Sequence, residues 1–71
     1  MAISYNKLWK LLIDKDMKKS QLRDLVGMST GTLSKLSKNE PVALTVLERI
    51  CKVLDCQFSD IVEYIPEEKH E

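Results

Sequence analysis

Apolar residues recur along the chain at the three- and four-residue spacing of amphipathic helices. A first helix is predicted over residues 4–15, with an apolar face made of Tyr5, Leu8, Trp9 and Leu12. A second, short helix should start between Lys18 and Ser20, with an apolar stripe made of Leu22, Leu25 and Val26. Gly27 should end it, because glycine adopts the left-handed conformation of a helix C-terminus without steric penalty. After a buried Met28, Ser29 should cap a third helix that runs to about Lys38.

Two further helices are predicted in the C-terminal half. After a turn at residues 39–41, the fourth helix is indicated by Leu44, Leu47, Ile50, Cys51 and Leu54. Thr45 and Glu48 match a capping box, which would start this helix at Thr45, but a start near Ala43 fits equally well. A last short helix is suggested by Phe58, Ile61, Val62 and Ile65, and Pro66 should stop it. No stretch alternates as a strand does, so the expected fold class is all-α, with five short helices.

Length and charge refine this picture. A chain of 71 residues forms one domain, which we place at residues 1–66, followed by a disordered acidic tail at residues 67–71. The formal net charge is zero, but the charges are separated along the chain. Residues 15–38 carry six basic and two acidic side chains, whereas residues 48–71 carry three basic and seven acidic ones. Such asymmetry is a better guide to an acidic partner than the total charge.

Several classes of protein do not fit the composition. No segment approaches the roughly 20 apolar residues of a membrane span, and the N-terminus lacks the features of a signal peptide, so we expect a cytoplasmic protein. Cys51 and Cys56 are too few for a disulfide scaffold, and with a single histidine, His70, no metal site is expected. No nucleophile is placed beside a base and no glycine-rich phosphate loop is present, so we expect neither an enzyme nor a cofactor.

The most informative stretch is residues 20–38. Leu22 precedes Gly27 by five residues, and Leu33 follows Gly27 by six. This spacing suits two short helices that cross steeply around a tight turn, because the leucines can pack together while the glycine permits the turn. Such an arrangement presents the second helix to the major groove of DNA. The pattern therefore predicts a helix-turn-helix.

The same stretch resembles the Cro/repressor-type (XRE-like) helix-turn-helix domains, in particular a small stand-alone group of transcriptional regulators. The matching residues are Met17-Lys18-Lys19-Ser20, Leu22-Arg23, Gly27-Met28-Ser29 and Thr32-Leu33-Ser34-Lys35-Leu36. The later segment from Val46 to Ile61 is also similar to that group, so the resemblance covers about residues 3–66. It implies a lambda-repressor-like DNA-binding fold.

The resemblance implies roles for individual residues on the DNA. Lys19 and Lys38 match positions that contact the phosphate backbone, and the exposed positions that meet base edges are matched by Thr30, Gly31, Ser34 and Lys35. The N-terminus of the third helix, at Ser29 and Thr32, also suits a phosphate because its backbone N–H groups are free. Two positions depart from the usual pattern. Arg23 stands where alanine is common, and we expect its guanidinium to point outward, while Gly31 offers no side chain to a base.

We therefore expect a sequence-specific DNA-binding transcriptional regulator, a repressor, that reads operator DNA through the helix at residues 29–38. Its expected partners are double-stranded DNA and a second copy of the chain, with the homodimer formed through the C-terminal helix region, and no small-molecule effector domain is expected. In that region the side chains that cannot all face inward are Phe58, Val62, Tyr64 and Ile65. The alternative is a protein-interaction module of the same fold, namely an antitoxin, an antirepressor or an adaptor.

Overall fold

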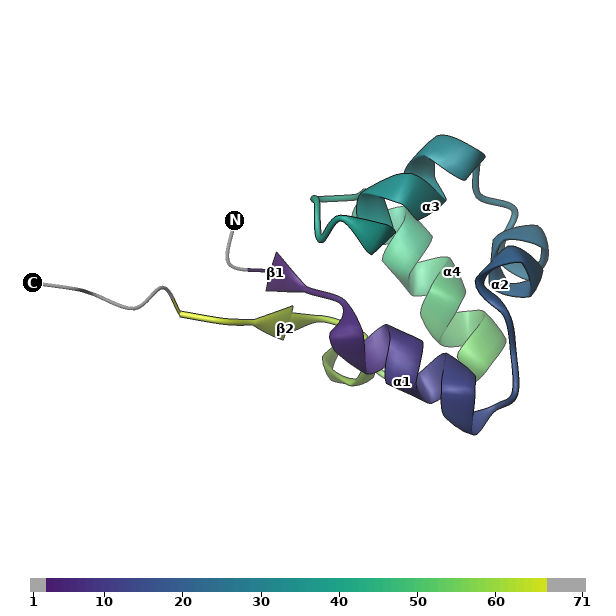
Figure 1. Ribbon diagram of the computed structural model, residues 1–71, viewed down its shortest axis with the longest axis horizontal. Coiled ribbons are helices and arrows are strands. Elements are labelled where there is room, and N and C mark those ends of the chain that lie inside the picture. Colours follow the sequence, from purple (N-terminus) through teal and green to yellow (C-terminus); the bar gives the residue numbers. More distant parts are fainter. Residues whose placement is uncertain (1–2, 67–71) are drawn as a thin grey trace, which may run out of the picture.

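The computed structural model describes residues 3–66. In chain order its elements are β1 (Ile3–Ser4), α1 (Asn6–Asp14), α2 (Lys19–Val26), α3 (Thr30–Ser37), α4 (Leu44–Leu54), the 3-10 helix η1 (Phe58–Asp60) and β2 (Glu63–Tyr64). Helices α1 to α4 enclose one core, and the two strands lie side by side at one end of the molecule (Figure 1). The mainly helical class is as predicted. The proposed acidic tail at residues 67–71 lies outside the described residues, and no helix within residues 3–66 could cross a membrane.

The core takes residues from each of the four α-helices. Its fully buried members, each at 2% exposure or less, include Tyr5, Leu8, Leu22, Leu36, Ile50 and Ile61. Three leucines of the predicted apolar faces are less buried than expected. Leu44, the first residue of α4, is 70% exposed. Leu25 is 60% exposed, although Leu22 and Val26 of the same helix are buried. Leu33 is half-buried and packs at the edge of the core.

All four α-helices end in the same way. One residue with a left-handed backbone follows each helix: Asp16, Gly27, Asn39 and Asp55, with φ between 55° and 80°. The next residue then donates its N–H to a carbonyl five residues earlier, in the bonds Met17–Leu12, Met28–Arg23, Glu40–Lys35 and Cys56–Cys51, at 2.8–3.2 Å. This is the Schellman arrangement, which satisfies carbonyls that the helix end leaves free. Gly27 was predicted for this position. Aspartate and asparagine fill the other three because they tolerate this conformation better than most residues.

The backbone at the N-termini of the helices is capped in different ways. Ser29 caps α3 as predicted, since its Oγ accepts from the N–H of Thr32 at 3.1 Å. At the start of α2, Gln21 Oε1 accepts from the N–H of Lys18 at 2.7 Å. The start of α4 follows the second of the two expectations, with Ala43 at the cap and no capping hydrogen bond from a side chain.

The predicted last helix is wrong. After η1 the chain extends and Glu63–Tyr64 pairs antiparallel with Ile3–Ser4, in the register Ile3 to Tyr64 and Ser4 to Glu63. Asp60 Oδ2 accepts from the N–H of Gln57 at 2.9 Å and closes the short 3-10 turn. Ile61, which is fully buried, then fixes the chain against the core. The apolar spacing is that of a helix, but pairing with the N-terminus determines the conformation.

Tyr5 joins the start of the chain to the end of α3. Its backbone N–H donates to Asn39 Oδ1 at 3.0 Å, and its hydroxyl donates to the carbonyl of Glu40 at 2.8 Å. Burial raises the pKa of the Tyr5 phenol, an effect that a backbone hydrogen bond from Val42 partly offsets. Because β1 directly precedes Tyr5, the last turn of α3 and the small sheet are held together.

Candidate nucleic-acid interface

Helices α2 and α3 form the predicted helix-turn-helix. The turn is residues 27–29, in which Gly27 has φ +80° and Met28 is buried. Helix α2 packs against both α3 and α4, so α3 is held at the outer edge of the domain (Figure 1). Leu36, a residue of α3, is fully buried and anchors this helix to the core. The side of α3 opposite Leu36 is uncovered by the described chain.

Most of the residues predicted to face DNA are exposed on or beside α3. Thr30, Gly31, Lys35 and Lys38 are exposed, and Ser34 is half-buried. Thr30 and Gly31 lie in the first turn, Lys35 lies in the last turn, and Lys38 is the C-cap. The helix therefore presents small polar groups at its start and two cations at its end. This arrangement can offer hydrogen bonds to base edges and positive charge to the phosphate backbone.

Ser29 and Thr32, which were also predicted site residues, are engaged in closing the helix. Ser29 Oγ accepts from the backbone N–H of Thr32 and lies 3.0 Å from Thr32 Oγ1. Ser29 is exposed and Thr32 is half-buried. These two hydroxyls fix the first turn of α3, and they have this structural role in the absence of DNA.

Gly31 is not required by packing within the chain. A β-carbon built on it would meet only Ser29 Oγ, at 3.7 Å, an ordinary van der Waals contact. No atom of the described domain therefore excludes a β-carbon at this position. Because Gly31 is exposed and has no side chain, another molecule can come close to the backbone of α3 at this point.

Lys19, the first residue of α2, lies over an aromatic ring. Its Nζ is 4.1 Å from the ring centroid of Trp9, which α1 contributes. The sequence placed Trp9 on the apolar face of the first helix, and the side chain is half-buried. The contact with Lys19 was missed, because the two residues belong to different helices and no spacing rule relates them.

The cations around the helix-turn-helix are largely free of acidic partners. Among residues 3–66, the one ion pair within 4 Å joins Arg23 Nε to Asp24 Oδ1 at 3.3 Å. The Arg23 side chain is 33% exposed, so it points partly outward, toward its neighbour in α2. The charges of Lys18, Lys19 and Lys35 remain available to a polyanion.

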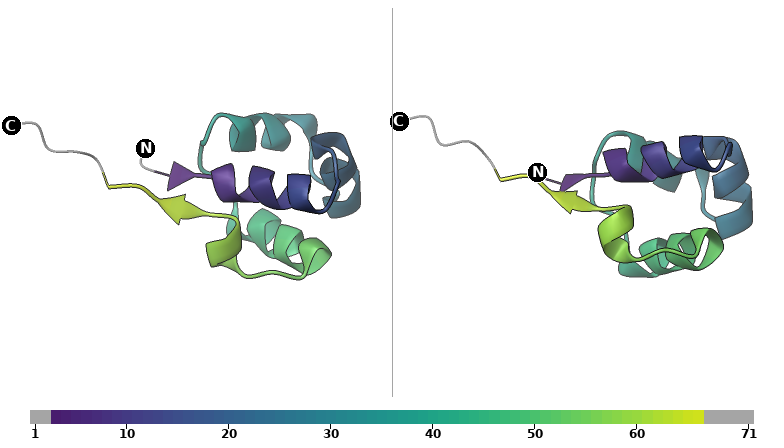
Figure 2. Two further views of the ribbon diagram at one scale, coloured as in Figure 1. Left: turned by 60° about the horizontal axis from the view of Figure 1, so that its bottom comes forward. Right: turned by 90° about the horizontal axis from the view of Figure 1, so that it is seen from below.

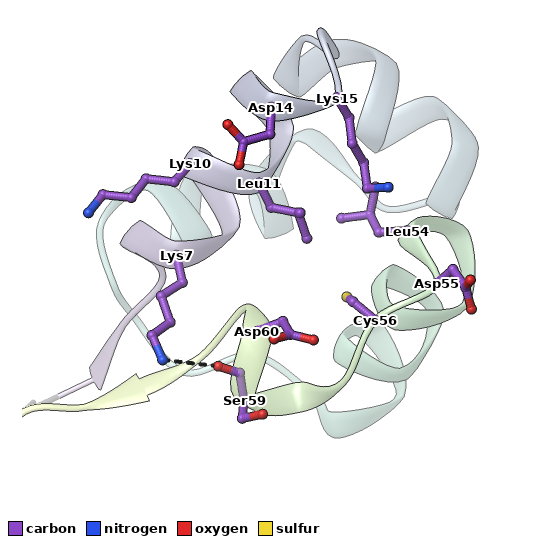
Figure 3. Close-up of a pocket in the computed structure, with 10 residues that line it drawn as sticks. All are labelled: Lys7, Lys10, Leu11, Asp14, Lys15, Leu54, Asp55, Cys56, Ser59 and Asp60. Atoms are coloured by element: carbon purple, nitrogen blue, oxygen red, sulfur yellow. Dashed lines mark hydrogen bonds between the residues drawn. The ribbon is translucent and has the colours of Figure 1, made fainter.

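A separate cleft lies between α1 and the segment that follows α4. Its volume is about 440 Å³, and its walls include three lysines and three aspartates: Lys7, Lys10, Lys15, Asp14, Asp55 and Asp60 (Figure 3). Lys7 Nζ donates to the carbonyl of Ser59 at 3.2 Å across one end. Figure 2 shows that α1 and η1 border this side, whereas α3 lies on another face. Balanced charges favour neither an anion nor a cation, so the cleft does not compete with α3 as a polyanion surface.

Cys51 and Cys56 are free thiols, both half-buried, at the C-terminal end of α4. Burial, and after it the neighbouring Cys51 thiol, raises the pKa of the Cys56 thiol to about 11. A thiol in this state is a poor nucleophile and a poor metal ligand at neutral pH. Within residues 3–66, no three histidine, cysteine, aspartate or glutamate side chains are grouped as a metal site would require.

Comparison with known proteins agrees with this arrangement. The family model of the Cro/C1-type HTH DNA-binding domain matches residues 7–67. The HTH-type transcriptional regulator YozG of Bacillus subtilis (strain 168) is 39% identical over 70 residues, which cover 96% of this chain and 82% of YozG. The crystal structure of the transcriptional regulator VanUg, form II, is similar with a TM-score of 0.90 and 62% identity, over 93% of this chain and 88% of that one.

Proposed function

Because the chain belongs to the Cro/C1-type helix-turn-helix DNA-binding family and is a DNA-binding transcriptional regulator, we propose that it represses transcription by binding a short operator as a dimer, with α3 in the major groove. The observation that carries this proposal is the uncovered outer face of α3, with small polar residues at its start and Lys35 and Lys38 at its end. A helix of this kind can enter the major groove while the helix before it crosses the backbone.

The proposed readout divides between two kinds of contact. Thr30 can donate to or accept from a base edge, or place its methyl group against that of thymine, and Lys35 is long enough to donate to guanine O6 or N7. Lys19 and Lys38 contact phosphates of the DNA backbone. The Ser29 cap occupies the N–H of Thr32, so at the N-terminus of α3 the N–H groups of Thr30 and Gly31 are those offered to a further phosphate. Because Gly31 contributes no side chain, we expect DNA shape to supply part of the specificity.

The proposed dimer is formed through exposed apolar residues around β2. In place of the predicted C-terminal helix, the described residues form η1 and β2. The exposure expected in this region remains, since Phe58, Tyr64 and Ile65 are 47%, 71% and 47% exposed. A two-fold dimer would place two α3 helices about 34 Å apart, one turn of DNA. Light scattering tests this directly: we expect twice the monomer mass for the wild type and the monomer mass for Tyr64→Glu. A wild-type protein that stays monomeric on selected DNA would contradict the dimer.

In vitro selection of bound duplexes, followed by anisotropy titration, tests the DNA-binding face. We expect the Lys35→Ala, Lys38→Ala double variant to bind the selected duplex at least tenfold more weakly than the wild type. Its plot of log affinity against log salt concentration should be shallower by about 0.9 for each phosphate that is no longer neutralised. Lys10→Ala is the matched control, because Lys10 is an exposed lysine that lines the cleft between α1 and η1 instead.

The same double variant separates this proposal from the alternative. A protein-interaction module of this fold would retain its cellular activity without Lys35 and Lys38, whereas a repressor would become inactive. The neutral net charge, the glycine at position 31 in α3 and the acidic C-terminal half of the sequence are what favour the alternative. Retained regulation of a reporter gene by the double variant would decide for it.

A further inference from the structure

The contact between Lys19 and Trp9 connects the beginning of α2 to α1. The Lys19 Nζ lies 4.1 Å from the ring centroid, well within the roughly 6 Å over which a cation is attracted to an aromatic face. We propose that Trp9 is a positioning residue: it holds the Lys19 ammonium at the N-terminal end of α2, ready to contact a DNA phosphate. This inference rests on the proposed function, and it adds a residue of α1 to the DNA-binding apparatus.

Lys19 is free to act in this way. Within residues 3–66, neither a hydrogen bond nor an ion pair holds its ammonium, and the first turn of α2 contains no acidic residue. The ring occupies one side of the ammonium, so N–H donors on the other side remain available. In a helix-turn-helix the first helix crosses the DNA backbone, and its N-terminus also presents free backbone N–H groups. A phosphate at this end would therefore meet a cation that is already in place.

Pre-organisation explains why the ring matters. A free lysine side chain samples many rotamers, and this freedom disappears when it binds a phosphate. The contact with the indole ring already restricts the rotamers of the lysine side chain in the free protein. Binding of DNA therefore costs less conformational entropy, and the affinity is higher. Replacing the ring by an aliphatic side chain should therefore weaken DNA binding only through Lys19.

Trp9 also has a structural role, from which the test must separate this one. Its side chain lines an apolar hollow of about 320 Å³ together with Leu12, Ile13 and Met17 and the stems of Lys18 and Lys19. A residue that only packs would alter stability and would change DNA affinity to the same degree whether or not Lys19 is present. Coupling between the two side chains distinguishes these roles.

The experiment is a double-mutant cycle, read by anisotropy on a fluorescein-labelled 20-base-pair duplex pool of random sequence at low salt. We expect Trp9→Leu to weaken binding about two- to fivefold in the wild-type background and to have no effect in the Lys19→Met background. Trp9→Phe, which keeps a ring, should restore part of the affinity. Lys18→Met is the matched control, and in the Lys18→Met background Trp9→Leu should weaken binding as much as it does in the wild type. Equal effects of Trp9→Leu with and without Lys19 would overturn the proposal.

A second measurement needs no substitution at Trp9, so it stands even if Trp9→Leu does not fold. Trp9 is the single tryptophan of the chain, and its emission can be excited selectively. Saturating DNA should change that emission in the wild type and in Lys18→Met, and leave it unchanged in Lys19→Met. An identical change in all three would refute the positioning role. A wild-type protein that shows no salt-dependent binding to the duplex pool would instead contradict the proposed function itself.

Discussion

Replacing Gly31 by alanine should stabilise the domain and weaken its binding to DNA. In the free protein the new methyl group has room, since the nearest atom, Ser29 Oγ, is 3.7 Å away. Alanine is favoured over glycine within a helix by about 0.5–1 kcal/mol, largely because it restricts the unfolded chain. For a domain of this size, 1 kcal/mol raises the melting temperature by roughly 4–8 °C. The expected increase is therefore about 2–8 °C.

The effect on DNA should have the opposite sign. Gly31 lies in the exposed first turn of α3, where the proposed complex brings the helix backbone close to the DNA. A methyl group at this point would push the helix away from the DNA and strain the hydrogen bonds proposed for Thr30 beside it. We expect the affinity for the selected duplex to fall about tenfold or more, an amount that corresponds to about 1.4 kcal/mol. Thermal melting by circular dichroism and anisotropy titration measure the two effects separately.

Gly27→Ala is the matched control for the stability argument. A β-carbon at Gly27 would also meet no atom within 4 Å, but the backbone there has φ +80°. The two glycines thus differ in backbone conformation and not in space. Alanine at Gly27 should cost roughly 1–2 kcal/mol and lower the melting temperature. If Gly31→Ala also lowered it, the stability reasoning would be wrong, and if Gly31→Ala bound the selected duplex as tightly as the wild type, the close approach of DNA to α3 would be wrong.

Three further predictions concern the body of the domain. Leu22→Ala should cost about 2–5 kcal/mol of unfolding free energy in urea titrations, because Leu22 is fully buried, whereas Leu25→Ala, three residues along the same helix, should cost under about 0.5 kcal/mol. Because burial raises the pKa of the Tyr5 phenol above 10.0, folding favours its protonated form, so this contribution is complete below pH 10 and disappears as the pH rises further. The alkaline fall in melting temperature should therefore diminish in Tyr5→Phe but persist in Tyr64→Phe. With its pKa raised to about 11, Cys56 should react with iodoacetamide at pH 8 on the order of 100-fold more slowly than an ordinary thiol, and rapid labelling in a peptide-resolved time course would contradict this.

Local signals in the sequence were enough for the helices and the turn between α2 and α3. Gly27 and Ser29 stand where a left-handed residue and a helix cap are required, and both requirements are set by their immediate neighbours. The conformation of residues 61–65 was not predictable in this way. Its partner strand begins at Ile3, at the other end of the chain, and no spacing of apolar residues records such a pairing. The periodicity at Phe58 and Ile61 therefore indicated a helix that the complete chain does not form.

The candidate site shows the same division between local and distant information. The exposure of Thr30 and Lys35 follows from their places on α3, and the family pattern identified them from the sequence. The placement of the Lys19 ammonium over Trp9 depends on where the folded chain places α1 relative to α2, which neither helix encodes alone. The helix cap at Ser29 is local and was predicted from the sequence, whereas the assignment of Ser29 and Thr32 as DNA-contacting residues stays a prediction.

The pairing of Ile3 with Tyr64 makes the distance between the two ends of the domain a direct readout of folding. In the native protein the strands lie side by side, whereas an unfolded chain of this length has a radius of gyration of roughly 25 Å. A donor and an acceptor dye attached beside the two strands would transfer energy efficiently only while the sheet is formed. Because Tyr5 connects β1 to the residues after α3, the same pair of dyes would report whether this connection to α3 is still formed when a ligand, a temperature change or a substitution loosens the chain termini.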